Sequence, residues 1–352
     1  MMTMLLATLA LAVVQSPVAD SARRVVAAYL ATHHVPGASV AVARGGRILW
    51  SEGFGFANLE LRAPASPETK FRIGSISKAL TSVAAARLWE QGKLDLDAPV
   101  QRYVPTFPDK GFPISTRQLG GHLSGLPHYT AADIVNRVRY PTVTAALDKF
   151  KDRPLLFPPG TKYAYSSYGW NLISVVVENA GGREFLAQMR AEVFEPFGMA
   201  NTLADQYDSI IPNRTSFYHR LREGTMINGP AVDNSDVWAG GGFLSTAEDL
   251  VRFGHGVLTG SVVGDRGREL LFTRQKTADG KETDYGFGWQ IATWDGRKTV
   301  SHGGSHVGAS AQLLVVPELN LAVAVLTNSN NPLVGALAKQ LAAIFAEAPP
   351  DR

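Results

Sequence analysis

A serine and a lysine three residues apart, Ser75 and Lys78, are the pair with the clearest chemical potential in this chain of 352 residues. Gly74 precedes them and predicts a turn, and the residues that follow have helical character as far as Trp89. Residues three apart on a helix share one face, so the two side chains should be adjacent. An amine held near a serine hydroxyl can take its proton and make it a nucleophile. The free N–H groups at a helix start would also suit an oxyanion.

A tyrosine-rich segment, residues 163–171, is a second candidate and follows the turn 158–160. If Tyr165 lies near a lysine cation, its pKa would fall and it could act as general base and then as general acid. Considered alone, such a loop before a helix is more often explained by packing.

A third stretch, His302-Gly303-Gly304, stands at the end of a predicted strand. Glycines there would let a substrate backbone lie against the strand, and the next amide, that of Ser305, could face a developing oxyanion. The alternative is a loop with two solvent-facing histidines, His302 and His306. We expect no metal at this pair, because it lacks helical spacing and nearby carboxylates.

The elements that must position these residues can be read from the hydrophobic pattern. An N-terminal helix (20–33) precedes a predicted hairpin (38–43 and 47–50), and 94–113 reads as a surface connection. The glycine run 240–242 indicates a turn where two backbones approach. Further helices are predicted at 115–123, 131–137, 143–149, 170–180, 183–192, 247–258 and 333–346, and antiparallel strands at 285–292, 298–302, 307–316 and 321–327.

Longer motifs carry a resemblance to a known family. They are residues 71–78, 93–105, 122–129, 232–235 with 238–246, and 302–304 with 307–310. From residue 36 onward the chain resembles the serine hydrolase superfamily of penicillin-binding proteins and class C β-lactamases, in which Ser-x-x-Lys is a signature. No Gly-x-Ser-x-Gly motif occurs, which disfavours a Ser-His-Asp α/β-hydrolase.

The resemblance implies an α+β fold of the β-lactamase/transpeptidase type, with an antiparallel sheet flanked by helices and an inserted, mainly helical lobe. We expect one hydrolase domain over 20–352. Its α/β lobe would take in about 20–114 and 233–352, and its helical lobe about 115–232.

The resemblance also implies roles for individual residues. Ser75 matches the acylated nucleophile, Lys78 the amine that helps to deprotonate it, and Tyr165 the first residue of a Tyr-x-Asn motif. The amides of Ser75 and Ser305 match the oxyanion hole. Substrate-binding positions are Ser167, His302, Gly303 and Gly304.

Two departures from the family pattern bear on the substrate. Ser167 replaces an asparagine and would hold a substrate amide more weakly. His302 replaces the lysine of the lactamases and is largely neutral at pH 7, so it would bind a β-lactam carboxylate weakly. The sequence therefore predicts a serine hydrolase, a β-lactamase-related peptidase, that acts through a Ser75 acyl-enzyme on peptide-like amides or esters.

Alternatives remain at this point. One is a promiscuous carboxylesterase or weak class C-type β-lactamase on the same scaffold. Another, of a different class, is a non-catalytic penicillin-binding or scaffold protein. The presence of Ser75, Lys78 and Tyr165 together argues against the second alternative.

Composition narrows the partners and cofactors. The net charge is only +3, and no Lys/Arg run exceeds a pair, which disfavours nucleic acid and anionic membranes as partners. The chain has no cysteine, which excludes disulfides and thiol catalysis. We expect a small-molecule or peptide substrate and no cofactor; the oligomeric state stays open.

The N-terminus is predicted to direct the protein out of the cytoplasm. The apolar run 4–14 has the length of a signal-peptide core and is too short to span a bilayer. Residues 1–19 are therefore predicted to be a signal peptide, with export to the periplasm or beyond the cell. A buried N-terminal helix is the alternative, and no other segment looks transmembrane.

Overall fold

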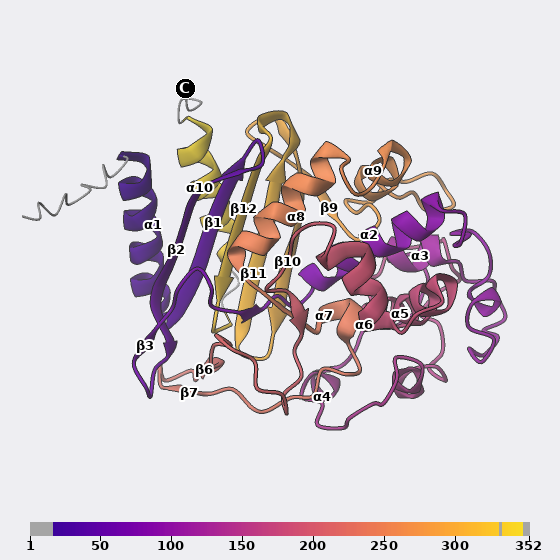
Figure 1. The fold of residues 1–352 in the computed structure, drawn as a ribbon. Helices are drawn as coiled ribbons and strands as arrows, with labels where there is room; N and C mark the ends of the chain where they lie inside the picture. The colour runs from indigo at the N-terminus through magenta and orange to yellow at the C-terminus, as the bar shows by residue number, and fades with distance from the viewer. Residues whose placement is uncertain (1–16, 331–332, 348–352) are drawn as a thin grey trace, which may run out of the picture.

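A seven-stranded antiparallel sheet with the order β3-β2-β1-β12-β11-β10-β9 organises the molecule, and helices cover both of its faces (Figure 1). The computed structural model describes residues 17–330 and 333–347. The first hairpin and the last strands share this sheet, as the sequence predicts, because β1 pairs with both β2 and β12. The architecture is α+β, with an antiparallel sheet flanked by helices, as the sequence analysis predicts.

The elements have the following bounds. The α-helices are α1 (Pro17–His33), α2 (Ile76–Glu90), α3 (Thr116–Gly120), α4 (Ala131–Ile134), α5 (Ser167–Gly181), α6 (Phe185–Met189), α7 (Trp238–Gly241), α8 (Ala247–Thr259), α9 (Asp265–Phe272) and α10 (Val334–Ala346). The strands are β1 (Gly37–Arg44), β2 (Arg47–Asn58), β3 (Ala63–Pro64), β4 (Phe71–Arg72), β5 (Leu203–Ala204), β6 (Tyr218–Arg220), β7 (Met226–Asn228), β8 (Phe243–Ser245), β9 (Gln290–Trp294), β10 (Arg297–His306), β11 (Ala309–Val316) and β12 (Leu321–Thr327). Short 3-10 helices are η1 (Val100–Arg102), η2 (Ala145–Lys149) and η4 (Pro317–Leu319), and η3 (Arg190–Phe194) is a π-helix.

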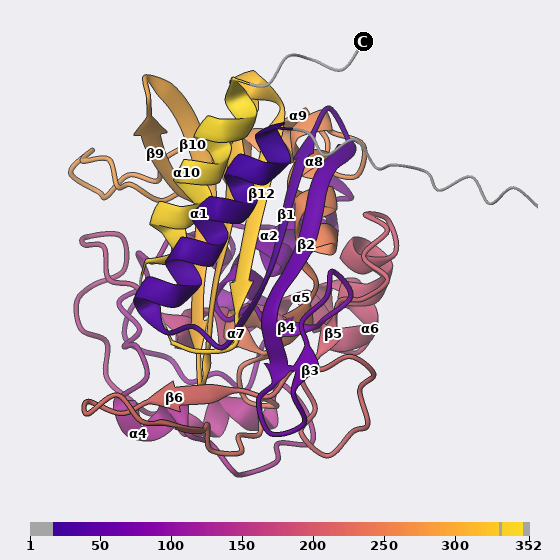
Figure 2. The same ribbon diagram turned by 90° about the vertical axis from the view of Figure 1, so that its left-hand side faces the viewer.

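The sheet separates two hydrophobic cores. On β12, Val323 and Val325 belong to the core beneath α1 and α10, whereas Ala322 and Ala324 belong to the core shared with α2 and α8. Figure 2 shows α1 and α10 side by side across the first of these faces. Because both faces are covered, β12 is buried along its whole length and has no polar side.

Several predicted elements differ in extent. The predicted strand 285–292 begins only at Gln290, because Gly286 N–H donates to the Trp289 carbonyl and closes a turn there. The predicted helix 131–137 ends at Ile134, and 143–149 forms only the 3-10 helix η2. The sequence predicted neither α9 nor the hairpin of β6 and β7.

The prediction that 94–113 is a surface connection is wrong. Its apolar side chains Leu94, Leu96, Val100, Val104 and Phe107 are all buried in the main core. They occur at irregular spacing and so show neither a helical nor a strand period, which is why the sequence pattern did not reveal their burial.

The predicted signal peptide falls mostly outside the described residues; its last three residues, 17–19, begin α1. In the described part of the chain, no helix combines the length and the apolar character that crossing a bilayer requires.

Candidate active site

Ser75 and Lys78 lie side by side at the start of α2. Ser75 is the residue that precedes the helix, and Lys78 Nζ lies 3.0 Å from Ser75 Oγ. The predicted three-residue spacing on a helix thus brings the two heads into hydrogen-bond contact. The Lys78 side chain is fully buried beneath the serine.

Two glycines set how closely β10 approaches this helix start. Gly74 has φ +48°, and a Cβ placed on it would lie 2.7 Å from Ser305 N. A Cβ on Gly304 would lie 1.9 Å from the Ile73 carbonyl oxygen and 3.2 Å from Ser75 N. Only glycine therefore lets the two backbones meet, and this contact places Ser305 beside Ser75, as a two-amide oxyanion hole requires.

The environment of Lys78 favours a neutral amine. Its Nζ donates to the Gly240 carbonyl at 2.5 Å. Burial lowers the pKa of Lys78 well below its ordinary value. Space is tight at Gly240, because a Cβ there would lie 3.2 Å from Asn171 Oδ1 and 3.4 Å from the Ser167 carbonyl oxygen. The run is a close backbone approach, as predicted.

Tyr165 reaches the pair from the loop before α5. It makes a side-chain hydrogen bond with Ser75, and Lys78 Nζ lies 5.0 Å from the centre of its ring. The buried His122 holds the residues on both sides of Tyr165. Its carbonyl accepts a hydrogen bond from Ala164 N–H at 2.9 Å, and its Nδ1 accepts one from Ser166 N–H at 3.1 Å. The His122 ring also packs against Tyr165, with 4.2 Å between ring centres.

The expectation that a nearby lysine cation lowers the pKa of Tyr165 is not met. Burial raises the pKa of Tyr165 far above its ordinary value, more than the Ser75 hydrogen bond lowers it. The lysine is itself driven toward neutrality in the same dry site, so it supplies little positive charge. Tyr165 therefore holds its proton and is suited to act as an acid, and the neutral amine of Lys78 is suited to act as a base.

A cleft of about 560 Å³ opens onto Ser75 and onto Gly303, Gly304 and Ser305 of β10. His128, Tyr129, Ile134, Ser310, Ala311, Gln312, Asn330 and Val334 complete its lining. Among these described lining residues there is no lysine or arginine. Ser167 and His302 do not line the cleft, because both side chains are buried behind it; contact of these two with a substrate stays a prediction.

His302 is held as a neutral ring by its neighbours. Tyr285 Oη lies 2.8 Å from His302 Nε2, and His302 Nδ1 lies 2.6 Å from the Gly303 carbonyl oxygen. The carbonyl can only accept, so the ring proton is on Nδ1 and Nε2 accepts from the tyrosine. Burial, with a smaller repulsion from Lys78, lowers the pKa of His302 to about 3.

This buried histidine should make stability depend on pH. Its folded pKa lies below the unfolded value of about 6.5, so as pH falls the unfolded chain takes up the proton first. We expect His302 alone to lower the free energy of unfolding by roughly 2–3 kcal/mol between pH 6.5 and pH 4, with no contribution above pH 7. Urea unfolding of wild type and His302→Gln across this range measures the difference. His34→Asn, at an exposed position, is the control, and an unchanged slope in His302→Gln would contradict the prediction.

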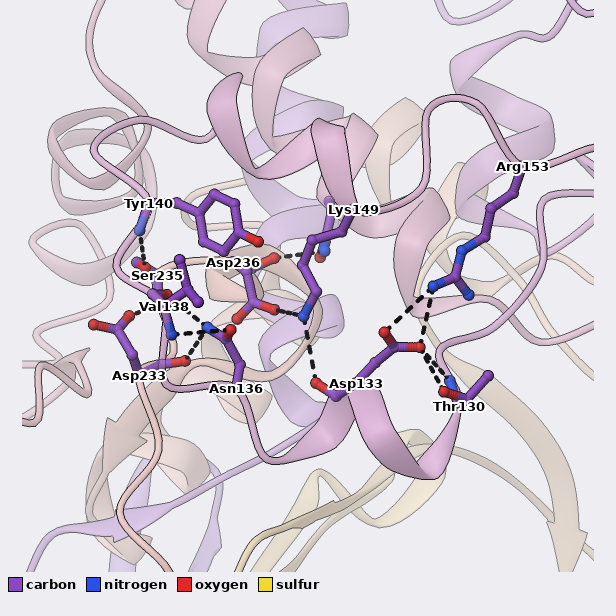
Figure 3. A network of polar contacts seen from close by, with 11 residues as sticks. Thr130, Asp133, Asn136, Val138, Tyr140, Lys149, Arg153, Asp233, Ser235 and Asp236 are labelled. Carbon is purple, nitrogen blue, oxygen red and sulfur yellow. Dashed lines mark hydrogen bonds and ion pairs between the residues drawn. The ribbon is translucent and has the colours of Figure 1, made fainter.

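A polar network fixes the loop that bears α4 at the rim of the cleft (Figure 3). Lys149 pairs with the buried Asp236, and its Nζ also donates to the Asp133 carbonyl at 3.4 Å. Asp133 in turn pairs with Arg153 at 3.3 Å, and Asn136 Nδ2 donates to the Asp233 carbonyl at 3.0 Å. The network holds this loop, which carries Ile134 of the cleft lining, against the segment 233–236.

His128 is a residue of the cleft whose part in the site the sequence analysis missed. Its Nδ1 accepts from the Ser167 backbone N–H at 3.1 Å, so a neutral ring carries its proton on Nε2. Desolvation, with a smaller repulsion from Lys78, lowers the pKa of His128 to about 4, which keeps the ring neutral at pH 7. A neutral His128 thus brings an N–H donor to the cleft lining beside Ser167, the position at which the family pattern has an asparagine. The missing asparagine was the only sequence signal for such a substitute.

We expect His128→Ala to lower kcat/KM for an amide substrate about five- to tenfold, the effect of one lost hydrogen bond. His128→Gln retains a side-chain N–H donor and should recover part of the loss. Steady-state kinetics on the two variants measures this. Equal activity of His128→Ala and wild type would show that the donor does not serve the substrate.

Comparison with known proteins identifies the family of this chain. The sequence profile of the Beta-lactamase family matches residues 22–347. The chain belongs to the Beta-lactamase family. Similar members include the mitochondrial serine β-lactamase-like protein LACTB of Homo sapiens, 33% identical over 80% of this chain and 69% of that protein. A D-aminopeptidase of Gluconobacter oxydans is 29% identical over 88% of this chain and 58% of that enzyme.

Solved structures agree with this family assignment. The octameric penicillin-binding protein homologue from Pyrococcus abyssi superimposes with a TM-score of 0.82 at 26% identity, covering 93% of this chain and 77% of that one. The D-amino acid amidase from Ochrobactrum anthropi has a TM-score of 0.82 at 20% identity, over 94% and 99% of the two chains. The second likeness shows the Beta-lactamase fold alone.

The predicted export to the periplasm or beyond the cell is contradicted by these comparisons. The LACTB relatives from Homo sapiens, Bos taurus and Mus musculus, each 33% identical, are mitochondrial proteins. They point to a mitochondrial rather than an exported location. An apolar run such as 4–14 does not by itself separate these destinations.

Proposed function

We propose that this protein is a serine hydrolase that cleaves peptide-like amides or esters through an acyl-enzyme on Ser75. The contact between the buried Lys78 amine and Ser75 Oγ, at 3.0 Å, is the observation that carries the proposal. A neutral amine at this distance can accept the hydroxyl proton. The D-aminopeptidase relative supports an amide substrate.

In the first half of the reaction, Ser75 Oγ attacks the substrate carbonyl while Lys78 Nζ takes the hydroxyl proton. The negative charge on the carbonyl oxygen rests on the amides of Ser75 and Ser305. Each such donor typically lowers the barrier by about 3 kcal/mol. Tyr165 then gives its proton to the leaving amine or alcohol and regains one from the Lys78 ammonium, and the Ser75 ester remains.

In the second half, a water molecule attacks the ester carbonyl. Its proton passes to Lys78, the same two amides hold the oxyanion, and the bond to Ser75 Oγ breaks. Ser75 recovers its proton from Lys78 as the acid product leaves. The enzyme thus returns to its initial state with one water consumed.

Intact-protein mass spectrometry with a fluorophosphonate probe tests the proposal. We expect one adduct on wild type and none on Ser75→Ala, which should retain its fold because the Ser75 side chain is only partly buried. Ser75→Ala should also lose turnover of D-alanine p-nitroanilide and of short p-nitrophenyl esters. Full activity in Ser75→Ala would refute the acyl-enzyme, and an unlabelled, folded wild type would favour a non-catalytic protein. A kcat/KM for nitrocefin far above the others would instead favour a β-lactamase.

A further inference from the structure

A second cavity, of about 1070 Å³, lies beside the cleft on the sheet face that carries α1 and α10. It is lined by residues of β9, β10 and β11, by Gly335 and Lys339 of α10, and by the segments 161–163 and 274–285. In Figure 2, α10 lies over the middle of the sheet and β9 projects beyond it. The cavity thus lies over the part of the sheet face that α10 does not cover, and the segments 161–163 and 274–285 form its other walls. The proposed mechanism does not use this cavity.

The cavity is continuous with the cleft at Gln312. This β11 side chain lines both spaces. On β10, Ser301 lines the cavity and Gly303 lines the cleft, and the two face the same side of the strand because they are two residues apart. Two residues of strand span about 7 Å. A Cβ on Gly303 would meet Gln312 Oε1 at 3.2 Å, so the glutamine stands at the border of the two spaces. An extended substrate bound at Ser75 can therefore reach the cavity along β10.

The cavity lining has more cationic than anionic side chains. The acids are mostly matched: Asp284 pairs with Arg274 at 2.7 Å, and Glu282 pairs with Lys276 at 3.2 Å. Asp279 accepts hydrogen bonds from Thr277 Oγ1 and from the Lys281 backbone N–H. The charge of Lys281 contributes to lowering the pKa of Asp279, whereas for the ammonium groups of Lys162 and Lys339 the described residues provide no ion-pair partner. Lys162 and Lys339 reach the cavity from different elements, a loop and α10.

The cleft itself has no cation for a substrate carboxylate. Its described lining contains no lysine or arginine, and the ring of His302 behind it is neutral and bonded to Tyr285. A carboxylate attached close to the scissile bond would therefore find no opposite charge there. One carried farther along the substrate would meet the lysines of the cavity.

We propose that this second cavity binds a carboxylate-bearing segment of an extended peptide-like substrate whose scissile bond lies at Ser75. The proposal rests on the proposed function and deepens it, because it selects acidic, extended peptides over short neutral ones. Gln312 marks the passage between the reacting bond and the anion site.

Matched internally quenched peptides test this. Each carries a scissile D-alanyl amide and a flexible extension of five residues that ends in either Glu-Glu or Gln-Gln, placed on one side of the amide or on the other. For one of the two placements, we expect wild type to prefer Glu-Glu about fivefold or more in kcat/KM, the effect of one to two exposed ion pairs. The preference should shrink at about 0.5 M salt, where the Debye length falls below roughly 5 Å.

The double variant Lys162→Glu/Lys339→Glu should abolish or reverse this preference and leave turnover of a short p-nitrophenyl ester unchanged. Lys93→Glu/Arg183→Glu changes the charge equally at exposed sites outside both lining sets and should behave as wild type. Equal kcat/KM for Glu-Glu and Gln-Gln peptides in wild type would overturn the proposal, as would an equal loss in the two double variants.

A binding measurement separates failure of this site from failure of the proposed function. Fluorescence anisotropy of a labelled Glu-Glu peptide on Ser75→Ala protein requires no turnover. Tighter binding of Glu-Glu than of Gln-Gln, lost in Lys162→Glu/Lys339→Glu, would support the anion site even if no substrate were cleaved. Equal binding of the Glu-Glu and Gln-Gln peptides to Ser75→Ala, together with wild type that hydrolyses the short ester, would refute the anion site alone.

Discussion

Lys78→Met is expected to lower kcat/KM by roughly 10²–10⁴-fold, the range that general acid–base help contributes. The methionine fills a similar volume in the buried site but offers no lone pair to the Ser75 hydroxyl. The reaction of Ser75 with a fluorophosphonate should slow in parallel, because the same proton transfer activates the serine for both. Stopped assays with the ester substrates and timed mass spectra measure the two effects.

The pH profile gives this prediction a second readout. Burial lowers the pKa of Lys78, and only its neutral form accepts a proton. Wild-type kcat/KM should therefore fall as pH drops through that lowered pKa, and this acid limb should be absent from the residual activity of Lys78→Met. Lys93→Met, at an exposed position, is the control. A Lys78→Met enzyme with the wild-type rate and pH profile would rule out the lysine as base.

Arg72→Met should destabilise the protein by about 3–5 kcal/mol, as expected when one partner of a buried ion pair is removed. Arg72 Nε lies 2.6 Å from Asp205 Oδ2, with side chains only 6% and 1% exposed. Asn234 Nδ2 donates to the same carboxylate oxygen at 2.8 Å, and Arg72 Nη1 donates to the Val307 carbonyl at 2.9 Å. At about 2.1 cal/mol/K of unfolding entropy per residue, Tm should fall by roughly 4–7 °C.

Two further variants test whether the loss of stability comes from the Asp205 charge left buried without Arg72 or only from the lost contact. Arg72→Met/Asp205→Leu removes both charges of this pair but also takes the carboxylate from Arg214, whose Nη1 lies 3.4 Å from Asp205 Oδ1, so it should recover only part of the lost stability. Arg190→Met breaks an exposed pair with Glu195 and should cost less than about 1 kcal/mol. Calorimetric Tm values decide the matter, and a double variant as unstable as Arg72→Met would contradict the reasoning. Because Val307 directly follows β10, Arg72→Met should also lower kcat by loosening the strand that carries Ser305.

Local spacing was enough to predict the central pair and much of the fold. Ser75 and Lys78 are in contact because a helix brings residues three apart together. The strand 321–327 has the predicted bounds, since its apolar run is flanked by clear turn residues. The catalytic roles of Ser75, Lys78 and Tyr165 stay predictions until the variants are measured.

What the sequence could not predict depends on irregular segments and on burial. His122 and His128 act through hydrogen bonds to the loop around Tyr165, about forty residues later in the chain, and no periodicity connects the two segments. The pKa of Tyr165 depends on how dry the site is, which only the packed structure reveals. Ser167 and His302 match motif positions, yet in the structure both side chains are buried behind the cleft.

The close approach of β10 to residues 73–75, which Gly74 and Gly304 permit, has a consequence for engineering this protein. Any side chain at Gly304 would collide with the Ile73 carbonyl, so a saturation library at this position should yield almost no folded, active clones. Screening effort there would be lost. Diversity is better directed to other residues of the cleft lining, Ile134 and Gln312, where a change in shape leaves the spacing of the Ser75 and Ser305 backbones intact. Part of the cleft, around the two glycines, therefore cannot be varied, whereas the rest of its lining can.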